Sequence, residues 1–106
     1  MATIRVEFDG GEWADLFDPG DLSFRAVEKL AGQLDHLRTT ADSAGAEEFI
    51  RERIAAWHLI DADSGAEMND PRTDDLKGLT GKKVKAIMSA FSASVSDFFP
   101  SRPKSN

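Results

Sequence analysis

The chain opens with Thr3-Ile4-Arg5-Val6-Glu7-Phe8-Asp9-Gly10-Gly11, and this stretch decides how the fold begins. Every second side chain up to Phe8 is apolar, and a period of two predicts a strand with one buried face. Asp-Gly is a strong hairpin signal because glycine adopts the positive φ that tight turns need. We therefore expect residues 12–17 to return as a second strand.

Two helices are expected to follow the hairpin. Apolar residues recur with helical spacing over residues 24–41, and Ser23 is placed to cap the first free N–H groups. A second amphipathic helix is predicted over 46–57. The segment 57–60 fits either the end of that helix or a short extended segment.

A polar loop over residues 61–75 is expected to separate the second helix from the third. Thr80 is the predicted N-cap of the third helix, whose apolar stripe runs on until Pro100 stops it. The fold class is therefore a small α+β domain over residues 1–99, predominantly helical, with an N-terminal β-hairpin and three amphipathic helices. Residues 100–106 are expected to form a flexible basic tail.

Composition places the chain among soluble proteins of one domain. It has 106 residues, of which 41% are hydrophobic and 30% charged. The absence of cysteine excludes disulfide scaffolds, cysteine-bound metals and thiol nucleophiles. We expect neither a membrane span nor a secretory signal, because no apolar run is long enough and the N-terminus lacks an apolar core.

Charge is distributed unevenly along the chain. The net charge is −6, yet residues 81–106 hold five bases and the single acid Asp97. Such asymmetry marks an interaction surface, although a basic end can also dock on its own acidic body or simply be solvated. The overall negative charge makes nucleic acid an unfavourable partner.

Two adjacent aromatic residues precede the tail. Phe98 and Phe99 cannot both face the same core easily, so one is a candidate anchor for a partner protein. Together with the basic cluster, they form the predicted partner-binding set: Lys82, Lys83, Lys85, Phe98 and Phe99.

The residue patterns that carry catalysis or metal binding are weak. The stretch from Asp61 to Gly65 begins like a calcium loop, but its glycine comes one position early and Arg72 stands where a bidentate glutamate is needed. The two histidines, His36 and His58, lie in no metal-binding spacing. No phosphate-binding glycine motif is present. We therefore expect no catalytic residues, no metal site and no cofactor.

Three segments carry a resemblance to a known group of proteins. They are Ile4–Trp13, Asp18–Ser23 and Ala56–Gly65, the last continuing to Asp70-Pro71. The arrangement resembles small structural-cluster proteins of long-tailed bacteriophages that infect actinobacteria, in particular their tail assembly chaperone-like proteins. The resemblance covers most of residues 3–90.

The resemblance implies a non-enzymatic morphogenesis protein that acts by protein–protein contact in the host cytoplasm. Its partners would be phage structural proteins, foremost the helical tape-measure protein, which such chaperones keep soluble. It also implies a homo-oligomer or a part of an assembly. The alternative is a permanent virion component, such as a head–tail connection, tail or capsid accessory subunit. A nucleic-acid-binding regulator and an enzyme are the remaining alternatives.

Overall fold

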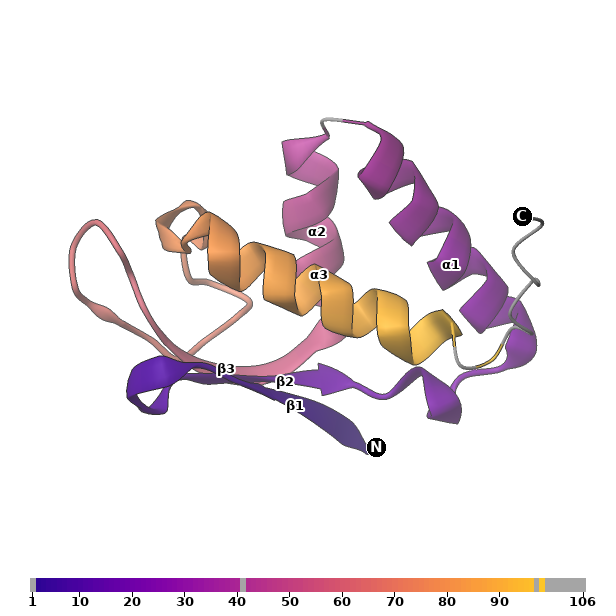
Figure 1. The fold of residues 1–106 in the computed structure, drawn as a ribbon, viewed down its shortest axis with the longest axis horizontal. Coiled ribbons are helices and arrows are strands. Elements are labelled where there is room, and N and C mark those ends of the chain that lie inside the picture. The colour runs from indigo at the N-terminus through magenta and orange to yellow at the C-terminus, as the bar shows by residue number, and fades with distance from the viewer. Residues whose placement is uncertain (1, 41, 97, 99–106) are drawn as a thin grey trace, which may run out of the picture.

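A computed structural model describes residues 2–40, 42–96 and 98. Within these ranges the chain forms a mixed α+β domain with a four-stranded antiparallel sheet in the order β1-β2-β3-β4. Three α-helices cover one face of the sheet, and the other face is open (Figure 1). An antiparallel sheet tolerates water on one face when its side chains alternate between apolar and polar.

The predicted N-terminal hairpin is present. Strands β1 (Thr3–Glu7) and β2 (Trp13–Phe17) pair with Arg5 opposite Asp15. Gly10 and Gly11 turn the chain between them with φ of 76° and 80°, in the left-handed region that favours glycine.

This hairpin is one half of a larger sheet, so the expectation of a predominantly helical fold fits only in part. Strand β3 (Ile54–Ile60) pairs with β2, and the two-residue β4 (Glu67–Met68) pairs with β3. The helix predicted over 46–57 is therefore wrong at its end, because α2 spans Ser43–Arg53 and the chain enters β3 directly. A lone hairpin is marginal in water, and β3 supplies the further strand that it needs.

The other two helices follow the predicted signals closely. Helix α1 spans Phe24–Thr39, and the Ser23 Oγ accepts a 3.2 Å hydrogen bond from the Ala26 N–H. Helix α3 spans Gly81–Ser96 after its Thr80 cap. The proposed tail 100–106 lies outside the described residues.

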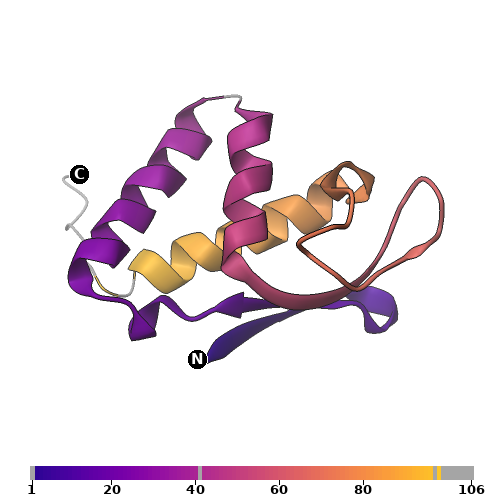
Figure 2. The same ribbon diagram turned by 180° about the vertical axis from the view of Figure 1, so that it is seen from behind.

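The core lies between the sheet and the helices. Helices α1 and α2 diverge from their connection like the arms of a V, and α3 crosses near the open end of the V (Figures 1 and 2). The Phe49 ring of α2 meets the Phe91 ring of α3 edge to face, with centroids 5.1 Å apart. Among the described residues, the largest fully buried side chains come from the sheet, the helices and one turn: Trp57, Phe91, Leu16, Leu30, Ile50, Ile54, Leu59, Ile87 and Pro19.

The predicted polar loop 61–75 is more ordered than its composition suggests. It contains β4, and its second half is hydrogen-bonded to the core. The Arg51 guanidinium donates to the Pro71 carbonyl (3.1 Å) and the Asp74 carbonyl (2.8 Å). The Trp57 indole N–H donates to the Asp74 carboxylate at 3.0 Å. Side chains of α2 and β3 therefore hold the loop against the domain.

Candidate functional site

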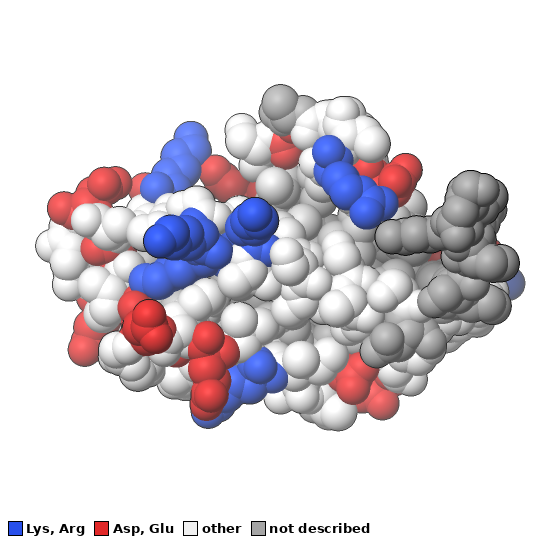
Figure 3. Space-filling model, viewed as in Figure 1, with Lys and Arg blue, Asp and Glu red and all other residues white. Residues whose placement is uncertain are grey.

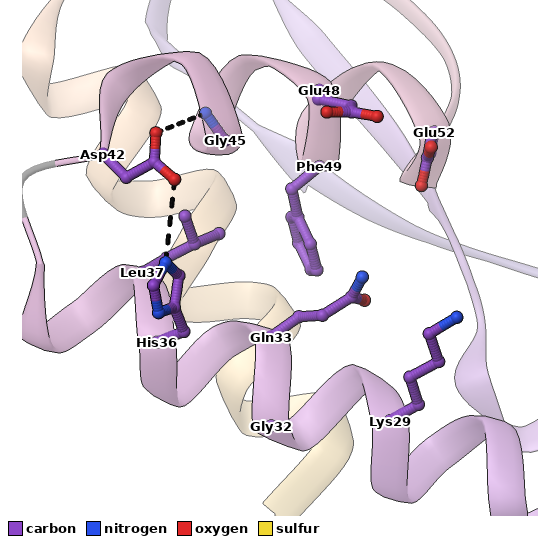
Figure 4. Close-up of a pocket in the computed structure, with 10 residues that line it drawn as sticks. All are labelled: Lys29, Gly32, Gln33, His36, Leu37, Asp42, Gly45, Glu48, Phe49 and Glu52. Atoms are coloured by element: carbon purple, nitrogen blue, oxygen red, sulfur yellow. Dashed lines mark hydrogen bonds and ion pairs between the residues drawn. The ribbon is translucent and has the colours of Figure 1, made fainter.

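A groove of about 410 Å³ lies between α1 and α2, where the two helices diverge (Figure 4). Phe49 points from α2 into the groove and, with Leu37 of α1, supplies its apolar base. Phe49 is buried and fixed by its contact with Phe91. The groove therefore has a rigid apolar floor, the property that recognition sites for apolar side chains share.

Two glycines open the groove. At Gly32 in α1, an added Cβ would meet no heavy atom within 4 Å. At Gly45 in α2, a Cβ would lie 2.4 Å from the Asp42 carboxylate, which caps α2 by accepting the Gly45 N–H at 2.8 Å. The missing side chain at Gly32 leaves room between the helices, whereas at Gly45 it makes room for the Asp42 cap.

Charged side chains form the rim. His36 and Asp42 lie at the end nearest the α1–α2 connection, with the His36 Nε2 3.6 Å from an Asp42 oxygen. Lys29 and Glu52 lie at the opposite end, and Glu48 stands on the α2 side between the ends (Figure 4). The α2 side is thus acidic, whereas the α1 side carries Lys29 and the histidine.

The groove brings His36 close to carboxylates, a combination that can serve catalysis or metal binding. His36 is 60% exposed, and of the groove's carboxylates only Asp42 is in contact with it. The ten described lining residues include no Ser, Thr, Tyr or Cys that a His–Asp pair could activate. No group of three or more His, Asp or Glu side chains in the described ranges is arranged to hold a metal ion.

The second histidine lies elsewhere. His58 is on the open face of the sheet, opposite Trp13 of β2. Its Nδ1 is 2.7 Å from the Asn69 Oδ1, so the ring is held by a local hydrogen bond between β3 and the following loop.

The three lysines of the predicted basic cluster do not share one environment. Lys82 and Lys85 are exposed in the first turns of α3. Lys83 instead forms an ion pair with Glu12, and each side chain is only 14% exposed. Because Lys83 is already engaged within the chain, only Lys82 and Lys85 of these three lysines are exposed.

Glu12 is the centre of this ion pair. Its Oε1 accepts from the Lys83 ammonium and from the Ile60 N–H, the latter at 2.7 Å. The bond from Lys83, and then that from Ile60, hold the pKa of Glu12 below its usual value. The carboxylate joins the β1–β2 connection, the end of β3 and the start of α3.

The predicted aromatic anchor lies at the other end of α3. Phe98 is 42% exposed and rests beside Gly20. Phe99 lies outside the described residues. At 1.5 Å per helical residue, Lys85 is about 16 Å from Ser96, the last residue of α3, so the lysines and Phe98 lie toward opposite ends of the helix.

Sequence reasoning missed the groove because both of its walls belong to amphipathic helices that looked complete by themselves. The available signal was Gly32, a poor helix former in the middle of an otherwise regular helix.

Comparison with known proteins gives no further assignment. No helix among the described residues is long and apolar enough to cross a membrane.

No protein-family model, curated protein or solved structure matches this chain.

Proposed function

We propose that the chain is a non-enzymatic bacteriophage morphogenesis protein, similar to tail assembly chaperones, that binds a helical segment of the tape-measure protein in the groove between α1 and α2. The resemblance of its sequence segments suggests the partner, and the groove supports the mode of contact. The single observation that carries the proposal is a preformed apolar floor between two diverging helices.

The dimensions of the groove suit a partner helix. Its volume of about 410 Å³ accommodates one or two large apolar side chains projecting from an amphipathic helix. The backbone of such a helix would lie outside the groove, between the rims. A long helical protein with many repeated apolar faces can offer this motif many times, which suits a chaperone that must cover its partner along its length.

The rim gives the proposed contact an orientation. Asp42, Glu48 and Glu52 favour basic residues beside the apolar stripe of the partner helix, on the side nearest α2. Lys29 favours an acidic residue on the other side. Binding should therefore weaken as salt is raised, because exposed charges are screened.

Gly32 allows the groove to be closed without disturbing the fold. We expect Gly32→Leu to fill the groove with its side chain and to abolish capture of the co-expressed tape-measure protein. Gly32→Ala is the matched control, because it adds only a Cβ in open space and leaves most of the groove available. Both variants should fold at least as well as the parent, since each removes a helical glycine that costs about 1 kcal/mol.

Capture is measured by affinity purification from cells that express both proteins. Loss with Gly32→Leu and retention with Gly32→Ala support the proposal. Equal capture by both variants, or no capture by the parent chain, contradicts it. Mass spectrometry of purified particles tests the alternative, because a permanent virion component would be present there in stoichiometric amount.

A further inference from the structure

The two edges of the sheet differ greatly in length. At one edge β4 has two residues, whereas at the other β1 has five. No strand of the described ranges pairs with the outer side of β1. A strand of this length presents a row of backbone groups that another strand can pair with.

The backbone bonds show which groups face outward. The Ala2 carbonyl accepts from the Asp18 N–H, and the Phe8 N–H donates to the Glu12 carbonyl. Even-numbered residues of β1 therefore turn their N–H and C=O groups toward β2. By the alternation of an antiparallel pair, Thr3, Arg5 and Glu7 turn theirs to the outer side.

We propose that β1 pairs antiparallel with β1 of a second copy of this chain, so that one sheet continues through both copies. This proposal does not rest on the proposed function, because β1 and the α1–α2 groove are separate surfaces. The second copy is the occupant that the sequence of β1 favours, because the strand is complementary to itself in one particular register.

Backbone geometry restricts the register. Outward-facing residues must lie opposite outward-facing residues, so the two-fold axis falls at Ile4, Arg5 or Val6. An axis at Arg5 places two arginines opposite each other. An axis at Val6 instead places Arg5 opposite Glu7 of the second copy and Ile4 opposite Phe8, and it does so twice.

The register centred on Val6 is therefore favoured on both faces of the sheet. The two Arg5–Glu7 pairs exchange about four backbone hydrogen bonds and are joined by opposite charges on the open face. The half-buried Ile4, Val6 and Phe8 form the close, non-hydrogen-bonded pairs on the helix-covered face. Their exposed apolar area would be covered by the second copy.

Arg5 is already held in position for this contact. Its guanidinium binds both carboxylate oxygens of Asp15, at 2.8 and 3.0 Å, and lies over the Trp13 ring, 4.2 Å from the centroid. Glu7 of the second copy would then extend a row of alternating charge across the strands. Less side-chain freedom is lost on pairing because the arginine is ordered beforehand.

The helical layer leaves room for the second copy. Helix α3 packs beside β1, on the same side of the molecule (Figure 1). Its exposed residues beyond the lysines include Ser89, Ser92 and Ser96, and a patch without charged side chains lies to the right of the central blue groups on this face (Figure 3). Small uncharged side chains allow two such layers to approach without repulsion.

The first test is the mass of the chain in solution. We expect the parent to show twice its monomer mass of 11.6 kDa by light scattering at micromolar concentration. Glu7→Lys places like charges opposite each other twice and should raise the dimer dissociation constant at least about tenfold. Glu28→Lys is the matched control, because it makes the same change of charge on the exposed face of α1 and should leave the dimer intact. A monomeric parent, or equal effects of both variants, overturns the proposal.

A compensating pair separates a lost contact from a damaged fold. Arg5→Glu combined with Asp15→Arg keeps the ion pair within the chain but reverses it, so this variant should also be monomeric. When it is mixed with Glu7→Lys, opposite charges face each other again and a mixed dimer should form. Absence of a mixed dimer between two folded monomers contradicts the charge pairing.

Cysteine substitution tests the register, because the chain has no cysteine of its own. Val6→Cys should form a disulfide-linked dimer on oxidation, since the two residues would meet at the two-fold axis. Ile4→Cys should not cross-link with itself but should do so when mixed with Phe8→Cys. Self-linkage of Ile4→Cys would place the axis elsewhere and overturn the register. The two proposals can fail separately. If the dimer proposal is wrong, normal capture of the tape-measure protein by Glu7→Lys still supports the proposed function.

Discussion

The carboxylate of Asp61 organises the turn that follows β3. Its Oδ1 accepts from the N–H groups of Asp63 (2.8 Å) and Ser64 (3.0 Å). These bonds, that from Ser64 first, lower the pKa of Asp61. The carboxylate that began an apparent calcium loop thus stabilises an ordinary turn, as hydrogen bonds from successive N–H groups stabilise an anion.

The substitution Gly78→Ala tests this arrangement. A Cβ at Gly78 would lie 2.1 Å from the Asp61 Oδ2, so Gly78→Ala must displace the carboxylate from its N–H donors. We expect the free energy of unfolding to fall in chemical denaturation, because the carboxylate would no longer accept both N–H groups in the same geometry. Gly81→Ala is the control, because no atom lies within 4 Å of its Cβ and the helix start tolerates alanine. Equal stability of the two variants would show that Asp61 moves at no cost.

At the scale of elements, side chains from α2 and β3 order the loop before α3. The Asp74 carboxylate accepts from the Trp57 indole and from the Asp70 N–H at 2.7 Å, while Arg51 binds two loop carbonyls. A loop held in this way can position the start of α3. The bonds from Arg51 and Trp57 join residues 17 to 23 positions apart, which no local pattern specifies.

Arg51→Lys should loosen this loop while keeping the charge. An ammonium group lacks the planar fork with which Arg51 reaches both carbonyls. We expect a loss of about 1–3 kcal/mol in stability and faster hydrogen exchange at the Asp70 amide. The exposed Arg25→Lys in α1 provides the control and should change neither quantity. Unchanged exchange at Asp70 in Arg51→Lys would contradict a role for Arg51 in ordering the loop.

At the scale of the whole molecule, the Glu12–Lys83 ion pair joins the beginning of the chain to its last described helix. The two residues are 71 positions apart, and both side chains are largely removed from water. Breaking an ion pair that is largely shielded from water leaves one charge without its partner, which is costly. The pair therefore couples the stability of the hairpin to the stability of α3.

The ion pair makes stability depend on pH in a defined direction. The hydrogen bond from Lys83 lowers the pKa of Glu12 from 4.5 in the folded chain. The ionised Glu12 therefore contributes its full stabilisation of the fold above pH 4.5, and this stabilisation is lost as the pH falls through the lowered pKa. Asp15, whose pKa is lowered by Arg5, acts in the same direction below 3.8. Glu12→Gln should cost about 1–3 kcal/mol at pH 7 and make the acid loss of stability shallower. Thermal unfolding between pH 2 and 7 measures both effects, with the exposed Glu28→Gln as control. If Glu12→Gln loses stability with falling pH as steeply as the parent, other carboxylates cause that loss.

The local parts of the fold were predictable from the sequence because their causes are local. The alternation of β1, the glycine turn at residues 10–11 and the caps at Ser23 and Thr80 each depend on neighbours within a few positions. The mixed α+β class follows from these signals. Lys82 and Lys85 are exposed on α3, and their predicted binding to a partner stays a prediction.

Tertiary structure decided the rest, because it depends on contacts between distant residues. Residues 54–57 have a pattern that suits the end of a helix, but pairing with β2 makes them a strand that buries Trp57. Lys83 looks like its neighbours in sequence, yet only the folded chain brings it to Glu12. The groove lies where α1 and α2 diverge, and its floor is Phe49 of α2, which packs on Phe91 of α3. Periodicity identifies which face of a helix is apolar, whereas the packing of the whole chain determines what that face meets.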